Sequence, residues 1–260
     1  MPVSDGLYYF EYKSAEAVGP PVVLLHGAGG MHLSWPPEIR RLMGCHVFAL
    51  DLPGHGRSEQ QSGLQHIHAY VQSVRNWIAS LEFPAVTLVG HSMGGAVAMS
   101  LAAEFPELVS GLGLVSTSAR FTVNPALLSD AANATTFHRA TATIVRWSFA
   151  EPAPPSLTEL ILRRMNETRP SVLLGDLQAC DRFDACDMLL EIKCPTVVIC
   201  GTDDRMTPLR QSQYLAGAIP GARLETVAQA GHMVMIEQPA AVAQILRSFT
   251  RSLVLFPGEE

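Results

Sequence analysis

Short runs of apolar and β-branched residues recur along the chain, and turns or helical segments separate each run from the next. The clearest runs are at 22–25, 47–50, 86–89, 112–115 and 196–199. A strand with almost no polar residue is buried on both faces, which is typical of a parallel sheet covered by helices. The pattern therefore predicts an α/β fold in which these runs form the central strands of one mostly parallel sheet.

Outside these central runs, the sequence predicts two further strands and several helices. The strands are expected at 7–12 and at 224–227. Ser34 is expected to act as the N-cap of a helix that has Pro36 in its first turn. Helical spacing or start signals predict the other helices at 66–81, 208–218 and 239–253 and directly after Ser92.

The segment 118–193 interrupts the alternation of strands and helices. It contains no strand-like run, and the Pro-rich stretch 152–155 breaks its helical pattern. We therefore expect a helical insertion between two strands of the sheet. The predicted organisation is a core domain formed by residues 1–117 and 194–260, with residues 118–193 forming a helical cap, or lid.

The composition excludes several classes of protein. Hydrophobic residues make up 48% and charged residues 16% of the 260 residues, and the net charge is −6. Disordered chains combine low hydrophobicity with high net charge, so this composition indicates a folded protein. The acidic balance argues against nucleic acid as a partner, because proteins that bind nucleic acid present basic surfaces.

The stretch 83–103 contains no charged residue and is long enough to cross a membrane. Pro84 and three glycines interrupt it, so it indicates a strand, a turn and a helix, and no membrane span is expected. The five cysteines are odd in number and show no CxxC spacing, which supports neither a disulfide framework nor a zinc ribbon. The N-terminus lacks the apolar region of a signal peptide, and we expect a cytoplasmic protein.

The most informative motif is Gly90-His91-Ser92-Met93-Gly94, which matches the pattern G-x-S-x-G. It follows a β-branched run and opens a helix, and this strand–turn–helix setting is the one required of a nucleophile elbow. The turn is tight, so glycines on both sides of the serine leave room for it. The motif predicts Ser92 as a catalytic nucleophile.

A serine hydroxyl needs a base, and the base needs an acid to orient it. In chains with this motif the acid and then the histidine follow the serine, which leaves His138 and His232 as candidates for the base. His232 is favoured because it comes just after the last predicted strand, whereas His138 lies in the insertion. The acid is Asp203 or Asp204, and the spacing to the helix start at 208 favours Asp204.

Acyl transfer also needs hydrogen-bond donors for a developing oxyanion. One donor is the backbone N–H of Met93, directly after the nucleophile, and the other is expected from the glycine-rich loop 26–30. In that loop the N–H of Ala28 is the predicted donor. The side chain of His26 is interpreted as a brace for the loop.

Apolar residues near these motifs predict the walls of a substrate pocket. Met31, Leu33, Met206 and Met233 belong to the predicted catalytic loops, and a wall of methionines suits varied apolar groups. The insertion is expected to add aromatic contacts from Phe121, Phe137 and Trp147. One of the insertion's arginines could bind a substrate carboxylate; they are Arg120, Arg139, Arg146, Arg163, Arg164, Arg169 and Arg182.

Taken in order, the motifs resemble those of the α/β-hydrolase fold superfamily. They are HGAGG at 26–30, DLPGHGRS at 51–58, GHSMGG at 90–95, GTDDRMTP at 201–208 and GHMVMIEQP at 231–239. The resemblance implies an eight-stranded, mostly parallel sheet with helices on both faces and a cap inserted after strand six. It also implies Ser92, Asp204 and His232 as the catalytic triad, with Ala28 and Met93 as oxyanion donors.

The resemblance further implies a serine hydrolase that cleaves a carboxylic ester, thioester or lactone of a small, largely apolar substrate, with no metal and no cofactor. Other reactions stay open: an enol-lactonase or carbon–carbon bond hydrolase of aromatic catabolism, or a cofactor-free perhydrolase. A ligand receptor on the same fold is the alternative outside enzymes, and the intact motifs argue against it. A homo-oligomer is also left open.

Overall fold

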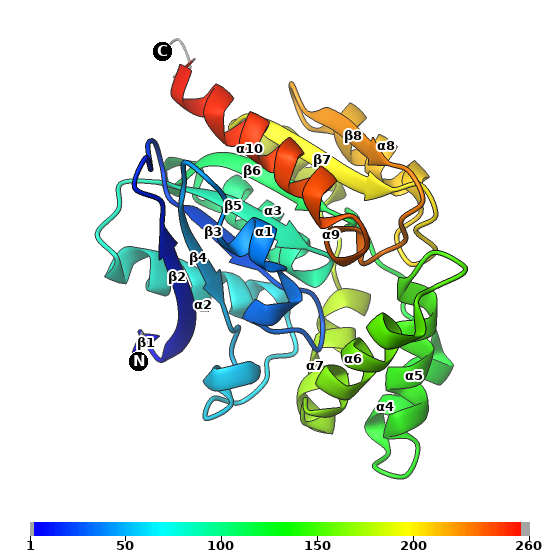
Figure 1. The fold of residues 1–260 in the computed structure, drawn as a ribbon. Coiled ribbons are helices and arrows are strands. Elements are labelled where there is room, and N and C mark those ends of the chain that lie inside the picture. The colour runs from blue at the N-terminus through cyan, green and yellow to red at the C-terminus, as the bar shows by residue number, and fades with distance from the viewer. Residues whose placement is uncertain (1–2, 256–260) are drawn as a thin grey trace.

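A computed structural model describes residues 3–255, and these residues build one eight-stranded sheet with helices on both faces (Figure 1). The strands lie in the order β1-β2-β4-β3-β5-β6-β7-β8. The strands β3 to β8 pair in parallel, while β1 and β2 pair antiparallel at one edge. The predicted mostly parallel α/β sheet is thus confirmed. The bounds are β1 Val3–Ser4, β2 Leu7–Lys13, β3 Val22–Leu25, β4 His46–Leu50, β5 Val86–His91, β6 Val109–Val115, β7 Thr196–Gly201 and β8 Arg223–Val227.

The central strands are buried on both faces because helices cover each side of the sheet. Alternate residues of one strand enter different cores: Val23 and Leu25 pack towards α2 and α3, whereas Val22 and Leu24 pack towards α1 and α10. This alternation follows from the two-residue period of a strand. The helices of the two layers are α1 Pro37–Arg40, α2 Ile67–Ser80, α3 Met93–Glu104, α8 Leu209–Ala218, α9 Val234–Glu237 and α10 Pro239–Leu255.

The chain between β6 and β7 is helical and lies to one side of the sheet, where the green helices gather in Figure 1. An isolated bridge between Arg120 and Asp184 joins the beginning and the end of this segment. Its helices are α4 Pro125–Ala132, α5 Phe137–Ser148, α6 Pro155–Asn166 and α7 Pro170–Asp181. We call them the α4–α7 segment. Short 3-10 helices complete the chain: η1 His32–Ser34, η2 Gly56–Ser58, η3 Pro106–Leu108 and η4 Cys186–Glu191.

The helix expected from Ser34 was placed too early. Residues 32–34 form the 3-10 turn η1, and α1 begins only at Pro37, with Pro36 as its N-cap. Ser34 has a different role, since its Oγ accepts a hydrogen bond from the N–H of Met31 at 3.2 Å. A proline suits the first turn of a helix, so the pair of prolines fixes the start of α1 after the serine.

Strand β6 is longer than the apolar run at 112–115 indicates, because it begins at Val109. Gly111 hides this start in the sequence, since glycine weakens a strand pattern. In the structure a Cβ at Gly111 would lie 2.5 Å from Leu253 Cδ1, so the glycine lets α10 pack closely on the sheet. None of the helices described, within residues 3–255, has both the length and the apolar character needed to cross a bilayer.

Candidate active site

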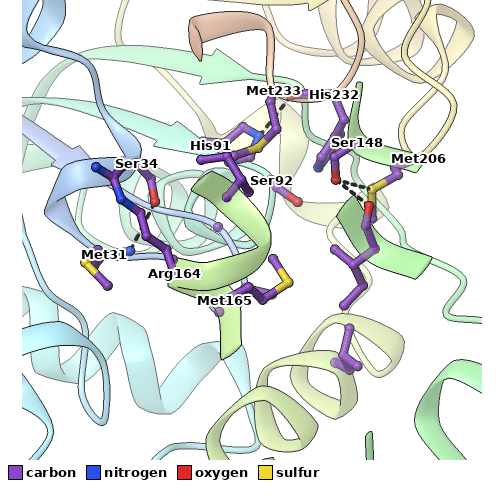
Figure 2. Close-up of a pocket in the computed structure, with 17 residues that line it drawn as sticks. Met31, Ser34, His91, Ser92, Ser148, Arg164, Met165, Met206, His232 and Met233 are labelled. Carbon is purple, nitrogen blue, oxygen red and sulfur yellow. Dashed lines mark hydrogen bonds between the residues drawn. The ribbon is translucent and has the colours of Figure 1, made fainter. Parts of the chain in front are cut away.

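A cavity lies where loops of the core meet the α4–α7 segment (Figure 2). Its walls are mostly apolar, and its volume is about 60 Å³. The lining residues come from the loop after β3, the turn after β5, helices α5 to α7 and the loops after β7 and β8. They are Gly27, Ala28, Gly29, Gly30, Met31, Ser34, His91, Ser92, Ile144, Ser148, Ile161, Arg164, Met165, Leu177, Met206, His232 and Met233.

Ser92 occupies the sharp turn between β5 and α3 and lines this cavity. Its φ is +50° and its ψ is −118°, a conformation that costs a non-glycine residue free energy and is held by its surroundings. The Ser92 N–H donates to Val115 O at 3.0 Å, and Thr117 Oγ1 donates to Ser92 O at 2.7 Å. Close packing leaves no room for a side chain at Gly94, where a Cβ would lie 2.4 Å from Leu25 O. These features are those of a nucleophile elbow.

His232 also lines the cavity, and its ring contacts Asp204 behind it. The Nδ1 of His232 lies 3.0 Å from Asp204 Oδ2. Because a carboxylate only accepts hydrogen bonds, this contact places the proton on Nδ1 and leaves the lone pair on Nε2. His232 is therefore prepared to accept a proton through Nε2.

Asp204 is held as a carboxylate although it is 5% exposed. Its Oδ1 accepts from the N–H groups of Met206 and Thr207 at 2.9 and 2.8 Å, and its Oδ2 accepts from Thr207 Oγ1 at 2.9 Å. Burial opposes ionisation, but the His232 ring and the Thr207 donors outweigh it and lower the pKa of Asp204 to about 2. At neutral pH the group is thus an anion that can stabilise a cationic imidazole.

The two alternatives left by the sequence lie elsewhere. Asp203 is exposed, and its contact with the site is through its backbone N–H, which donates to Ala230 O at 2.9 Å. His138 is exposed on α5 and does not line the cavity. The structure therefore brings Asp204, and not Asp203, to His232.

His91 lies beside His232 and bonds to the backbone that carries it. Its Nε2 donates to the backbone O of His232 at 3.0 Å, and the two ring centroids are 4.9 Å apart. Burial and the neighbouring His232 lower the pKa of His91 to about 3, so this ring is neutral. Sequence reasoning assigned His91 no role, although it lies next to Ser92.

The glycine-rich loop after β3 presents the Ala28 N–H. The Gly27 carbonyl, on the same peptide, accepts from Gly30 N–H at 3.0 Å and from His26 Nδ1 at 2.8 Å. In a trans peptide the N–H points opposite to the C=O, so the Ala28 N–H is directed away from these partners. No hydrogen bond among the described residues uses it. Met93 is the first residue of α3, and its N–H has no acceptor within the helix.

The loop that carries His232 is tied to the end of α5 by Glu237. One carboxylate oxygen accepts from Gly231 N–H at 2.8 Å and the other from Ala150 N–H at 2.9 Å. The Met233 N–H donates to Ser148 O at 2.9 Å and adds a third link. These contacts connect the predicted base with the α4–α7 segment.

The predicted pocket residues divide into two groups. Met31, Met206 and Met233 line the cavity, whereas Leu33, Phe121, Phe137 and Trp147 do not. Phe121 packs on the ring of Phe183, with centroids 6.0 Å apart. Leu33 contributes only its backbone O nearby, which accepts from Arg164.

Helical geometry explains why the two aromatic residues of α5 miss the cavity. Phe137 lies seven residues, or about two turns, before the cavity residue Ile144. Trp147 is next to the cavity residue Ser148 and is rotated about 100° from it around the helix axis. The residues found instead share one face of each helix: Ile144 and Ser148 on α5, and Ile161, Arg164 and Met165 on α6. Their spacing of three or four residues was the signal in the sequence.

Comparison with known proteins agrees with this fold. The alpha/beta hydrolase family matches residues 22–245. An enol-lactonase from Burkholderia xenovorans superimposes with a TM-score of 0.87 at 25% identity, over 94% of this chain and 96% of that one. A thermophilic esterase from Thermogutta terrifontis, solved with malate bound, gives 0.83 at 26% identity, over 95% and 94%. In sequence, an (E)-2-((N-methylformamido)methylene)succinate hydrolase from Acinetobacter baylyi is 26% identical, over 93% of each chain. The chain belongs to the alpha/beta hydrolase family.

Proposed function

We propose that this protein is a serine hydrolase that cleaves a carboxylic ester, thioester or lactone of a small substrate through an acyl-enzyme. The observation that carries the proposal is the placement of Ser92 and His232 on one apolar cavity, with the buried Asp204 on the far side of the imidazole. The esterase and enol-lactonase among the similar structures support the same class of reaction.

In the first half of the reaction, Ser92 Oγ attacks the carbonyl carbon while His232 Nε2 takes the hydroxyl proton. Negative charge then develops on the carbonyl oxygen, and the N–H groups of Ala28 and Met93 stabilise it. Asp204 stabilises the imidazolium that forms. The tetrahedral intermediate collapses when His232 gives its proton to the leaving alcohol or thiol, which leaves an ester on Ser92.

In the second half, water replaces the alcohol. His232 Nε2 takes a proton from the water as its oxygen attacks the acyl carbon, and the same two N–H groups hold the second oxyanion. Collapse of this intermediate returns the proton to Ser92 Oγ and releases the acid. The apolar walls keep other water away from the intermediate.

A fluorophosphonate probe tests the nucleophile directly. The purified protein should be labelled at Ser92, hydrolyse p-nitrophenyl acetate, and lose both properties in the variant Ser92→Ala. Ser34→Ala is the matched control, because Ser34 lines the same cavity but its Oγ bonds the local backbone. Hydrolysis that survives Ser92→Ala, or labelling that is lost only in Ser34→Ala, would contradict the proposal.

A specific observation favours one substrate class within this reaction, namely small esters or lactones that carry a carboxylate. Arg164 is the one Lys, Arg, Asp or Glu among the residues that line the cavity within the described chain. None of the ion pairs found in residues 3–255 includes it. Its Nη1 donates to Leu33 O at 3.1 Å, and it lies beside Ser34 and Met31 (Figure 2). A guanidinium without an acidic partner is suited to bind a carboxylate.

The succinate-derivative hydrolase and the esterase solved with malate bound support this substrate class. The test compares p-nitrophenyl acetate with the monoester p-nitrophenyl succinate on wild type and Arg164→Met. We expect the variant to raise KM about tenfold or more for the anionic ester only, since one charged hydrogen bond contributes about 1.5–3 kcal/mol. Arg163→Met, on the exposed side of α6, is the control. Equal effects on both esters would exclude this role for Arg164.

A further inference from the structure

Asp176 is a buried carboxylate that the reaction described above does not use. It lies on α7 and is 0% exposed, in a helix whose other buried residues are apolar or glycine. A buried carboxylate is costly unless hydrogen bonds compensate it. Its partners therefore show what this charge does in the fold.

Three donors from three different parts of the core converge on this carboxylate. Tyr70 Oη on α2 donates to Oδ1 at 2.6 Å, and His55 Nε2 lies 2.8 Å from Oδ2. The third donor is the N–H of Gly29, 2.8 Å from Oδ2. Gly29 belongs to the glycine-rich loop after β3. The residue before it, Ala28, supplies the proposed oxyanion N–H.

The hydrogen bonds of the His55 ring favour its cationic form. Its Nδ1 faces Pro53 O at 3.1 Å and its Nε2 faces the carboxylate, and both partners are acceptors, so both nitrogens carry a proton. Burial opposes this charge, but Asp176 outweighs it and raises the pKa of His55. The side chains of His55 and Asp176 are both 0% exposed. They thus form a buried ion pair beside the glycine-rich loop after β3.

The α4–α7 segment holds both polar groups of Gly29. Asp176 accepts from its N–H, and Thr168 Oγ1, between α6 and α7, donates to its carbonyl at 3.1 Å. Gly29 has φ +63°, and a Cβ there would lie 3.1 Å from Leu173 Cδ1 of α7. The loop is therefore fixed by a segment that lies far away in the sequence.

We propose that Asp176 is a positioning residue that holds the oxyanion loop in its catalytic geometry by fixing the peptide next to the Ala28 N–H. The inference rests on the proposed hydrolase reaction. Its physical basis is that an oxyanion donor works only when its direction is fixed before the charge develops. Asp176 accepts from the N–H of the Ala28–Gly29 peptide. His26 and Gly30 donate to the carbonyl of the Gly27–Ala28 peptide. The peptides on both sides of Ala28 are therefore held by hydrogen bonds.

The test measures the turnover of p-nitrophenyl acetate, per active site titrated with a fluorophosphonate, in the variant Asp176→Leu, which leaves the Gly29 N–H without its acceptor. We expect kcat to fall about 10- to 100-fold with KM within about threefold of wild type, because the donor acts in the transition state. The Ki of phenylboronic acid, which forms a tetrahedral adduct with a reactive serine, should rise by a similar factor. A residue needed only for folding would change neither quantity per titrated site.

Two further variants keep the test decisive. Asp176→Leu also removes the partner of the buried His55 ring, so the double variant with His55→Gln removes both members of the pair and should recover stability but not kcat. Thr141→Val is the matched control, since Thr141 Oγ1 donates to Asn166 Oδ1 at 2.7 Å and joins α5 to α6 away from the loop. It should lower the stability and leave kcat per titrated site unchanged.

The proposal is overturned if the double variant keeps kcat within threefold of wild type, or if Thr141→Val loses kcat as strongly as Asp176→Leu. Failure of the underlying reaction has a different signature, because Ser92→Ala would then keep the hydrolysis of wild type.

Discussion

Replacing Asp204 by asparagine tests the proposed acid with atomic precision, because the surroundings dictate how the amide must lie. Oδ1 of Asp204 accepts from two backbone N–H groups, at Met206 and Thr207. The amide oxygen of asparagine must take the place of Oδ1, because an NH₂ group in that place would face two N–H donors and could accept from neither. The NH₂ group then faces His232 Nδ1 at the place of Oδ2. It donates to that nitrogen, so the proton moves to Nε2 and the imidazole can no longer act as the base.

The size of the effect follows from the same hydrogen bonds. If the side-chain amide of the Asp204→Asn variant flipped over, its oxygen would face His232 and restore the tautomer with the proton on Nδ1. This turn would lose two backbone hydrogen bonds of about 1–1.5 kcal/mol each and leave two buried donors unsatisfied. A penalty of about 3–4 kcal/mol corresponds to a 10²- to 10³-fold smaller active population. The neutral amide also no longer stabilises the imidazolium. We therefore expect kcat to fall by about 10³- to 10⁴-fold, in line with the loss for this change in serine proteases.

The assay is kcat for p-nitrophenyl acetate at pH 7.5, together with the circular dichroism spectrum and Tm as checks of folding. Asp203→Asn is the matched control, because this neighbouring carboxylate is exposed and only its backbone N–H is bonded to the site. It should keep kcat within about twofold of wild type. A folded Asp204→Asn variant with more than a tenth of the wild-type kcat, or an equal loss in Asp203→Asn, would refute the reasoning.

Three further predictions concern stability. Gly94→Ala should yield no folded protein or lose more than about 3 kcal/mol of unfolding free energy, since its Cβ would meet the backbone oxygens of Leu25 and His26. Gly217→Ala on α8 has nothing within 4 Å of the added Cβ, so it should gain about 0.5–1 kcal/mol. Urea unfolding measures both changes. Glu237→Gln removes one of two backbone acceptors and should cost about 1 kcal/mol at pH 7, and an unchanged urea midpoint would contradict this. The pKa of Asp204 falls from its ordinary value of 3.8 to about 2, so its ionised form stabilises the fold above pH 4 and this contribution is lost as the pH falls towards 2. The stability difference between wild type and Asp204→Asn should therefore shrink by about 1 kcal/mol between pH 6 and pH 3, and a constant difference would exclude the linkage.

The strands and the elbow were predictable because their signals are local. A central parallel strand must be apolar on both faces, so β3 and β5 are visible as short runs, and β3 has the predicted bounds Val22–Leu25. The turn at Ser92 needs residues without side chains on both sides, which only glycine provides. Edge strand β1 has only two residues, of which Val3 is exposed, so no hydrophobic pattern marks it.

The walls of the cavity were harder to predict because they depend on how α5 and α6 are rotated against the core. Aromatic side chains were favoured for their size, yet Phe137 packs two turns away and Ile144 takes the place at the cavity. Hydrophobic spacing shows that a helix has a buried face, but not which part of that face contacts a neighbouring helix and which part contacts a ligand. Asp176 was similarly hidden among the acids of the insertion, although a single carboxylate in the apolar run 172–177 marks a buried partner.

The proposed catalytic residues and the walls of the cavity come from different parts of the chain, so substitutions in each should affect different kinetic constants. Ser92, Asp204 and His232 follow strands of the sheet, so the packing of the core fixes their geometry. The residues Ile144, Ile161, Arg164 and Met165 come from the α4–α7 segment and have no proposed part in proton transfer. Substitutions in these walls should therefore change KM and substrate preference while kcat for a small neutral ester changes little. Asp176 is the expected exception, since it belongs to the segment by sequence and contacts the oxyanion loop in space, so kcat should respond to this one position of α7.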